Sequence, residues 1–165
     1  MAQPLSVLGT LHTAISLVPV IAGLYGFARR GTIDPSKRSG KLYLGGLVLA
    51  VASSFTVSST GGLNPGHAFG IVVLLVAFGG LLVNRLRFFG RLRPYLSTFA
   101  LSLSFLLGLV PAINESLTRL PVSHPLASAP MAPVVLQSLL GCLVVFVIGF
   151  AAQCWMLRAR GRRAP

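Results

Sequence analysis

The chain has 165 residues, of which 54% are hydrophobic and 10% are charged, and its formal net charge is +12. A soluble domain carries about 25% charged residues, so this composition argues against a water-soluble fold and indicates a membrane protein. The two acidic residues, Asp34 and Glu115, fall in different predicted loops, which argues against catalysis by paired carboxylates.

Five apolar segments follow one another along the chain, and each has about the 20 residues that a helix needs to cross a membrane. Because lipid offers no partners to bare backbone groups, each segment must be helical. The sequence therefore predicts an all-α fold, a polytopic bundle of transmembrane helices in a single membrane domain. The predicted spans cover about residues 5–28, 42–60, 66–84, 95–113 and 134–157.

The N-terminal ten residues contain no Lys or Arg, whereas a signal peptide begins with a positive region, so the first apolar segment is predicted to be a retained span. Residues 114–133 contain four prolines and no periodicity, which indicates a loop on the outer side. Cys142 and Cys154 lie on the last span, about 18 Å apart along a helix, too far for a disulfide.

The basic residues predict the orientation of the bundle. Of the 14 Lys and Arg residues, 13 lie after the first span, after the third span or in the tail 158–165, and Arg119 is the exception. Positively charged loops stay in the cytoplasm, so the N-terminus is predicted outside and the C-terminus inside the bacterial inner membrane. These topology signals, which we also expect to face anionic lipids, are Arg29, Arg30, Lys37, Arg38, Lys41, Arg85, Arg87, Arg91, Arg93, Arg158, Arg160, Arg162 and Arg163. Because this placement accounts for the net charge, we expect no binding to nucleic acid.

Aromatic, small and hydroxyl residues suggest how the helices pack. Tyr and Trp favour the membrane interface, and four such residues fall at the predicted cytoplasmic ends, namely Tyr25, Tyr43, Tyr95 and Trp155. The glycine pairs Gly66 and Gly70, and Gly79 and Gly80, are typical of closely approaching helices. Hydroxyls in the second and fourth spans either bond within and between helices or line a polar path, as in a transporter or permeation subunit.

The histidines are the residues of greatest chemical interest. His12 and His67 lie 16 and 17 residues from the predicted cytoplasmic ends of their spans, so both sit about 24 to 26 Å above that boundary and close to the outer surface. Ionisable groups at membrane depth usually face the bundle interior, so we expect His67 to turn inward toward His12.

Three interpretations of this pair remain open. His12 and His67 are candidate axial ligands of a b-type haem, because two imidazoles at one depth could hold an iron from both sides. Metal, proton or quinone chemistry is a second alternative, with His124 or Glu115 joining the site. The plain alternative is an interfacial histidine, with His67 completing the turn Asn64-Pro65-Gly66 that precedes it.

Several short motifs in residues 8–113 carry a resemblance to a known family. His12, the stretch Gly40-Lys41-Leu42-Tyr43, then Gly61-Gly62 and His67 follow one another in the order seen in a family of small bacterial predicted membrane proteins with a domain of unknown function. The family often has further histidines in its cytoplasmic loops, where this chain has Ser36-Lys37-Arg38 and Arg91-Leu92-Arg93. More distantly, the pattern is similar to di-haem membrane cytochromes, which here would imply an outer haem at most.

The sequence contains no P-loop, no metalloprotease motif and no nucleophile–base–acid set. We therefore expect a small inner-membrane protein that is not itself an enzyme and serves as an accessory or redox-linked component, with a membrane protein as partner. The haem-binding electron-transfer module and the permeation subunit are the alternatives.

Overall fold

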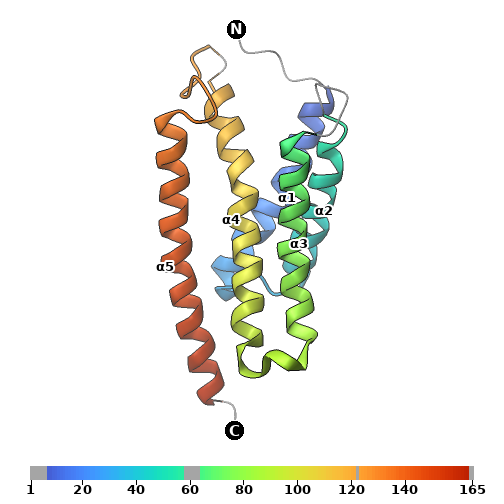
Figure 1. Cartoon of the computed structure of the whole chain (residues 1–165), viewed down its shortest axis with the longest axis vertical. Coiled ribbons are helices and arrows are strands. Elements are labelled where there is room, and N and C mark those ends of the chain that lie inside the picture. The colour runs from blue at the N-terminus through green and yellow to red at the C-terminus, as the bar shows by residue number, and fades with distance from the viewer. Residues whose placement is uncertain (1–6, 58–63, 122, 164–165) are drawn as a thin grey trace.

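The computed structural model describes residues 7–57, 64–121 and 123–163, with the side chains of residues 162 and 163 excepted (Figure 1). These ranges are helical or turn-like and contain no strand, which confirms the predicted all-α class. The elements are α1 Val7–Arg30, α2 Arg38–Ser54, α3 Pro65–Arg85, the short 3-10 helix η1 Arg87–Leu92, α4 Arg93–Arg119 and α5 Pro133–Arg163.

The helices run alternately up and down in an elongated bundle (Figure 1). α1 packs against α2, and α3 packs against α4, with further contacts between α2 and α3 and between α1 and α4. α5 lies along α4 at the edge of the bundle. We call the end where α1 and α3 begin the histidine end, because it carries His12 and His67, and the end that holds η1 the basic end.

The core lies where α1, α2, α3 and α4 meet. Tyr43 of α2 is 1% exposed, and its hydroxyl lies 2.8 Å from that of Ser104 on α4, which is fully buried. Ser104 donates its own proton to the carbonyl of Leu101, so Tyr43 is the donor to Ser104. The predicted place of Tyr43 in an interfacial aromatic belt is therefore wrong, because this serine satisfies the phenol inside the bundle.

Small residues allow two helix pairs to approach closely. A side chain at Gly46 of α2 would meet Pro19 of α1, since a Cβ there would lie 2.9 Å from the proline Cδ. A Cβ at Gly80 of α3 would lie 2.8 Å from the Cβ of Ala100 on α4. Gly80 was predicted to act in this way, whereas a Cβ at its neighbour Gly79 would have no neighbour within 4 Å.

α2 is shorter at its C-terminal end than the predicted span 42–60. The hydroxyls of Ser53, Ser54 and Thr56 donate to carbonyls three residues earlier in the chain, and the helix ends at Ser54. Such local bonds compete with the backbone bonds that would continue a helix. Residues 58–60 of the predicted span lie outside the described residues.

α4 is longer than the predicted span 95–113. It continues through Pro111 to Arg119, so Glu115 lies on a helix and not in a loop. On this helix Glu115 forms an ion pair with Arg119. The i,i+4 spacing of this pair favours one more helical turn. α5 then begins at Pro133, so the connection between the two helices is shorter than the predicted loop 114–133.

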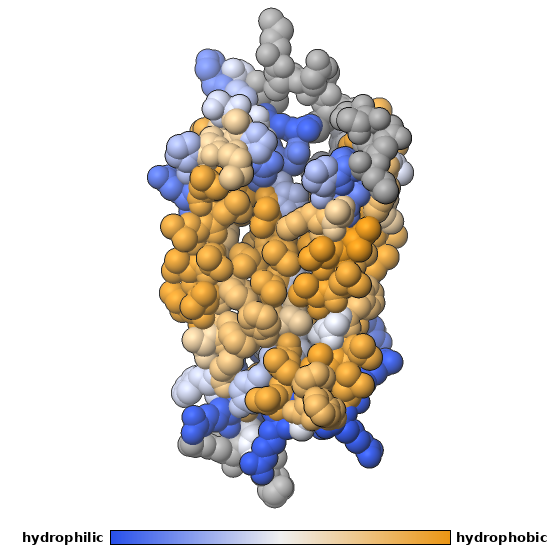
Figure 2. Space-filling view, in the orientation of Figure 1, coloured by the Kyte–Doolittle hydropathy of each residue, from blue (hydrophilic) through white to orange (hydrophobic). Residues whose placement is uncertain are grey.

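Four helical segments are long and apolar enough to cross a membrane, namely Val7–Arg30, Pro65–Arg85, Arg87–Arg119 and Pro133–Gly161. Figure 2 shows an apolar band around the middle of the visible face, with polar residues gathered at both ends. The protein is thus an all-helical, multi-pass membrane protein. α2, with 17 residues, is the shortest α-helix of the described chain.

Candidate functional site at the histidine end

His67 sits at the junction between α2 and α3. The Asn64 side chain accepts a hydrogen bond from the backbone N–H of His67 at 3.1 Å, and the backbone N–H of Asn64 donates to Nδ1 of His67 at 3.2 Å. This reciprocal pattern is a capping box at the start of α3, with histidine in the place that Glu or Gln usually takes. Pro65 at the first helical position fits the same start.

The second ring nitrogen of His67 holds the end of α2. Its Nε2 lies 3.2 Å from the carbonyl oxygen of Ser54, and because a carbonyl only accepts, Nε2 carries the proton. The ring also stacks on Phe55, with centroids 4.4 Å apart and planes 12° from parallel. His67 is 4% exposed, so it does turn inward, but its partners are Asn64, Ser54 and Phe55.

His12 approaches the same end of α2 from α1. Its Nδ1 lies 2.8 Å from the hydroxyl oxygen of Ser53, whose own proton goes to the carbonyl of Ala50. Nδ1 of His12 is therefore the donor, and Nε2 is the acceptor. A weak contact of 3.5 Å joins that Nε2 to the hydroxyl of Ser16.

The two histidines thus reach neighbouring residues of α2, His12 through Ser53 and His67 through Ser54. Glu115 lies in the last turns of α4, which ends at this same end of the bundle. Nearby in sequence, Asn114 has a buried Oδ1 without a hydrogen-bond partner in the described part of the chain. The histidine end therefore brings together polar groups of α1, α2, α3 and α4.

A haem iron between His12 and His67 does not fit this arrangement. Nδ1 of His67 accepts from Asn64 and its Nε2 donates to Ser54, so neither nitrogen has a lone pair free for iron. Ligation would require the capping box of α3 or the bond to α2 to open. His12 fits better, since its Nε2 is held only by the weak contact with Ser16.

A metal site with more ligands is not formed either. No group of three or more His, Cys, Asp or Glu side chains stands close enough to hold a metal ion in residues 7–57, 64–121 and 123–163. His124 is exposed in the connection between α4 and α5. Cys142 and Cys154, both on α5, are free thiols, as their spacing predicts.

The basic residues gather at the opposite end of the bundle. Arg29 and Arg30 close α1, Lys37, Arg38 and Lys41 surround the start of α2, and Arg85 closes α3. Arg87 and Arg91 lie in η1, Arg93 begins α4, and Arg158, Arg160, Arg162 and Arg163 lie in the last turns of α5. All 13 therefore lie at the basic end, because each is at the end of a helix that points there.

The sequence did not predict one set of hydrogen bonds between helices at the basic end. Gln153 of α5 is 4% exposed; its side-chain oxygen accepts from Ser102 of α4 at 3.0 Å, and its Nε2 donates to the carbonyl of Gly31 at 2.8 Å. Arg160 adds a longer bond of 3.3 Å to the carbonyl of Arg30. An amide inside an apolar segment is a signal that a partner helix must satisfy it.

The loop between α1 and α2 is also ordered by local bonds. The carboxylate of Asp34 accepts from the backbone N–H of Ser36 at 2.9 Å and from its hydroxyl at 2.7 Å. Burial alone would raise the pKa of Asp34, but the bonds from Ser36 and the charges of Lys37 and Arg30 lower this pKa below its ordinary value.

Comparison with known proteins adds no assignment. No family model, curated protein or solved structure matches this chain.

Proposed function

We propose that this protein is a small inner-membrane protein with five spans that acts as an accessory component, without catalytic groups of its own, beside a membrane protein partner. In this proposal α2 is the fifth span, the histidine end faces outward and the basic end faces the cytoplasm. The gathering of basic residues at one end supports this orientation. We also propose that the membrane is the bacterial inner membrane, and that the chain belongs to the family of small predicted membrane proteins with similar motifs.

The hydrogen bonds made by the His67 ring are the main support for the proposal. A histidine at membrane depth is by default a candidate for function, but both ring nitrogens of this one are used in the structure, since Nδ1 caps the start of α3 and Nε2 joins α3 to the end of α2. Other polar groups inside the bundle are used in the same way, as in the pairs Tyr43 with Ser104 and Ser102 with Gln153. Polar groups that hold helices together support a structural component more than a reaction site.

The permeation alternative has less support. Ser53, Ser54 and Thr56 bond to carbonyls of their own segment, and Ser104 does the same while accepting from Tyr43. Hydroxyls whose protons are engaged in this way give less support to a polar lining. The haem alternative keeps one favourable observation, the weakly held Nε2 of His12.

Site-specific photo-crosslinking in intact cells tests the accessory role. A photoreactive residue is placed, one at a time, at exposed apolar positions of three helices, Leu24 of α1, Leu75 of α3 and Val145 of α5. We expect at least one position to yield a discrete adduct with a second membrane protein, while the other positions yield lipid adducts. Lipid adducts alone at all of these positions would overturn the proposed role.

A further inference from the structure

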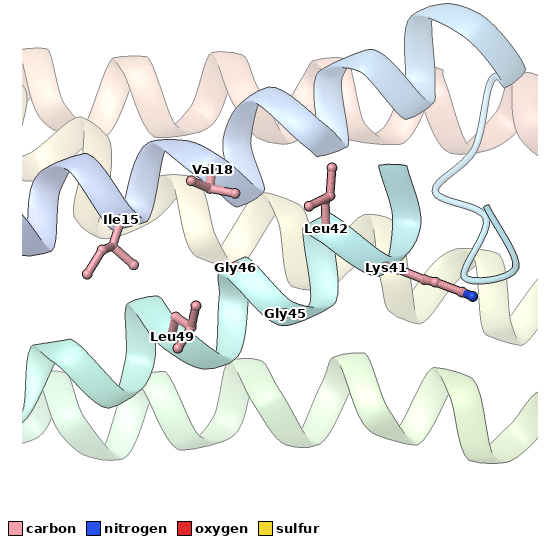
Figure 3. Close-up of a pocket in the computed structure, with 7 residues that line it drawn as sticks. All are labelled: Ile15, Val18, Lys41, Leu42, Gly45, Gly46 and Leu49. Carbon is pink, nitrogen blue, oxygen red and sulfur yellow. The ribbon is translucent and has the colours of Figure 1, made fainter. Parts of the chain in front are cut away.

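A shallow groove of about 250 Å³ runs along the outside of the bundle between α1 and α2 (Figure 3). Its lining is apolar except at one end, where Lys41 stands. The lining residues are Ile15 and Val18 of α1 and Lys41, Leu42, Gly45, Gly46 and Leu49 of α2.

The groove exists because two successive glycines remove side chains from α2. Gly46 lets Pro19 of α1 come close, as described above, and a Cβ there would also lie 3.1 Å from a methyl carbon of Val18. A Cβ at Gly45 would have no atom within 4 Å, so the space beside it is open. A larger residue at position 45 would therefore begin in open space at the lining of the groove.

The groove follows one face of α2 that begins with a basic residue. Lys41, Gly45 and Leu49 are spaced four residues apart within α2, which places them above one another on the helix surface. From the basic end, this face of α2 changes from the cation of Lys41 to an open apolar surface. A molecule that lies along it would need an anionic head and an apolar chain.

Lys41 is placed to bind such an anionic headgroup. Figure 3 shows its side chain extending away from the apolar lining residues toward the start of α2. It is exposed, and its ammonium group has no ion pair or hydrogen bond with the side chains that the structure describes. A lysine near a membrane surface commonly buries its stem and presents its charge to the headgroups.

The length of the groove matches one leaflet of a bilayer. From Lys41 to Leu49 the helix rises about 12 Å, and half of a hydrocarbon core of about 30 Å is about 15 Å. An acyl chain that begins beside Lys41 would thus follow the groove to about the middle of the membrane.

We propose that this groove between α1 and α2 binds one anionic phospholipid, with a phosphate-bearing headgroup beside Lys41 and an acyl chain over Gly45. The proposal rests on α2 lying in the membrane and does not depend on the accessory role. A lipid held here would cover the gap between the two helices and fix the orientation of the hairpin relative to the membrane surface.

Native mass spectrometry of the full chain in detergent tests the proposal, with phosphatidylglycerol and phosphatidylcholine titrated separately. We expect one tightly bound phosphatidylglycerol in the parent protein and weaker binding of phosphatidylcholine. Lys41→Gln should lower the affinity for phosphatidylglycerol about fivefold, the equivalent of about 1 kcal/mol for one charge at the membrane surface, and leave phosphatidylcholine unchanged. Gly45→Leu should abolish the tight site.

Two matched controls separate the groove from general effects. Gly149→Leu adds the same side chain to α5 at a glycine that also has no neighbour within 4 Å, and Arg91→Gln removes an exposed charge from η1. Both controls should bind phosphatidylglycerol as the parent does. The fold of each variant is checked by circular dichroism, and Lys41→Gln decides the question if Gly45→Leu does not fold.

Two results would overturn the proposal. The first is phosphatidylglycerol binding that is the same in the parent, in Lys41→Gln and, where it folds, in Gly45→Leu. The second is a parent dimer that Gly45→Leu dissociates without change in lipid binding, because a second copy of the chain would then occupy the groove.

Discussion

Nε2 of His67 donates to the carbonyl oxygen of Ser54 at 3.2 Å, and this bond joins the first turn of α3 to the last turn of α2. The last carbonyls of a helix have no partner within the helix, and the first N–H groups of the next helix lack one as well. One buried imidazole satisfies groups of both kinds, because its Nδ1 also accepts from the N–H of Asn64.

Replacing this residue should destabilise the junction. In His67→Ala, the Ser54 carbonyl and the Asn64 N–H lose their partners, so we expect the free energy of unfolding to fall by about 1–3 kcal/mol. Thermal or denaturant unfolding in detergent, followed by circular dichroism, measures this. His124→Ala, at an exposed histidine, should leave stability unchanged. Equal stability of the two variants would refute the capping role.

The hydrogen bond between Ser102 of α4 and Gln153 of α5 should appear as a coupling free energy between these two residues. Ser102→Ala, Gln153→Ala and the double variant form a double-mutant cycle for the 3.0 Å bond between these side chains. Hydrogen bonds between transmembrane helices average about 0.6 kcal/mol in such cycles and reach about 1.7 kcal/mol, and we expect a value in this range.

A control cycle tests whether that coupling is specific. Ser138 donates to the Val134 carbonyl of its own helix, so Ser138→Ala combined with Ser102→Ala should give additive effects on the free energy of unfolding. Additive effects for Ser102 with Gln153 would contradict the observed bond.

The charge on Asp34 should make stability depend on pH. Since its pKa in the folded protein lies below the ordinary value of 3.8, the ionised carboxylate stabilises the fold at neutral pH. That contribution is fully present above the unfolded pKa and is lost as pH falls through the folded pKa. Asp34→Asn should therefore be less stable than the parent at about pH 7 and nearly equal to it well below pH 3.8.

Unfolding of both proteins across this range provides the measurement. A stability difference that stays constant down to the lowest pH would show that the charge of Asp34 is not its source.

Reporter fusions test the proposed orientation. Fusions after Arg38, Arg91 and Arg163 should read cytoplasmic, because each follows or lies within a basic segment. Fusions after Asn64 and Ser123 should read external. The Asn64 fusion is the most informative, since it depends on the 17-residue α2 crossing the membrane. A cytoplasmic reading there would remove α2 from the set of spans.

Hydropathy and charge predicted the helical class and the gathering of basic residues at the helix ends, because lipid imposes both. They did not predict which polar residues are buried. Tyr43 looks interfacial by its position in the sequence, yet Ser104, 61 residues away, accepts its proton inside the bundle. The early end of α2 likewise follows from hydroxyl bonds to its own carbonyls, which hydropathy does not register.

The candidate site was predicted in part. The depth argument correctly placed His67 inside the bundle, where it is 4% exposed. It did not identify the partners, because Asn64 and Ser54 become neighbours of the ring only once α2 has ended and the chain has turned. The turn Asn64-Pro65-Gly66 was the relevant signal, and the plain alternative that His67 completes that turn describes the structure best.

The most direct measurement of the central claim, that the histidines hold helices together, is a reduced-minus-oxidised visible spectrum. The full chain is expressed with haem supplied and purified, alongside His12→Ala and His67→Ala. We predict no haem bands in the parent protein, because both nitrogens of His67 are engaged by Asn64 and Ser54. A b-type spectrum in the parent that disappears in both variants would contradict the account and establish the two histidines as axial ligands.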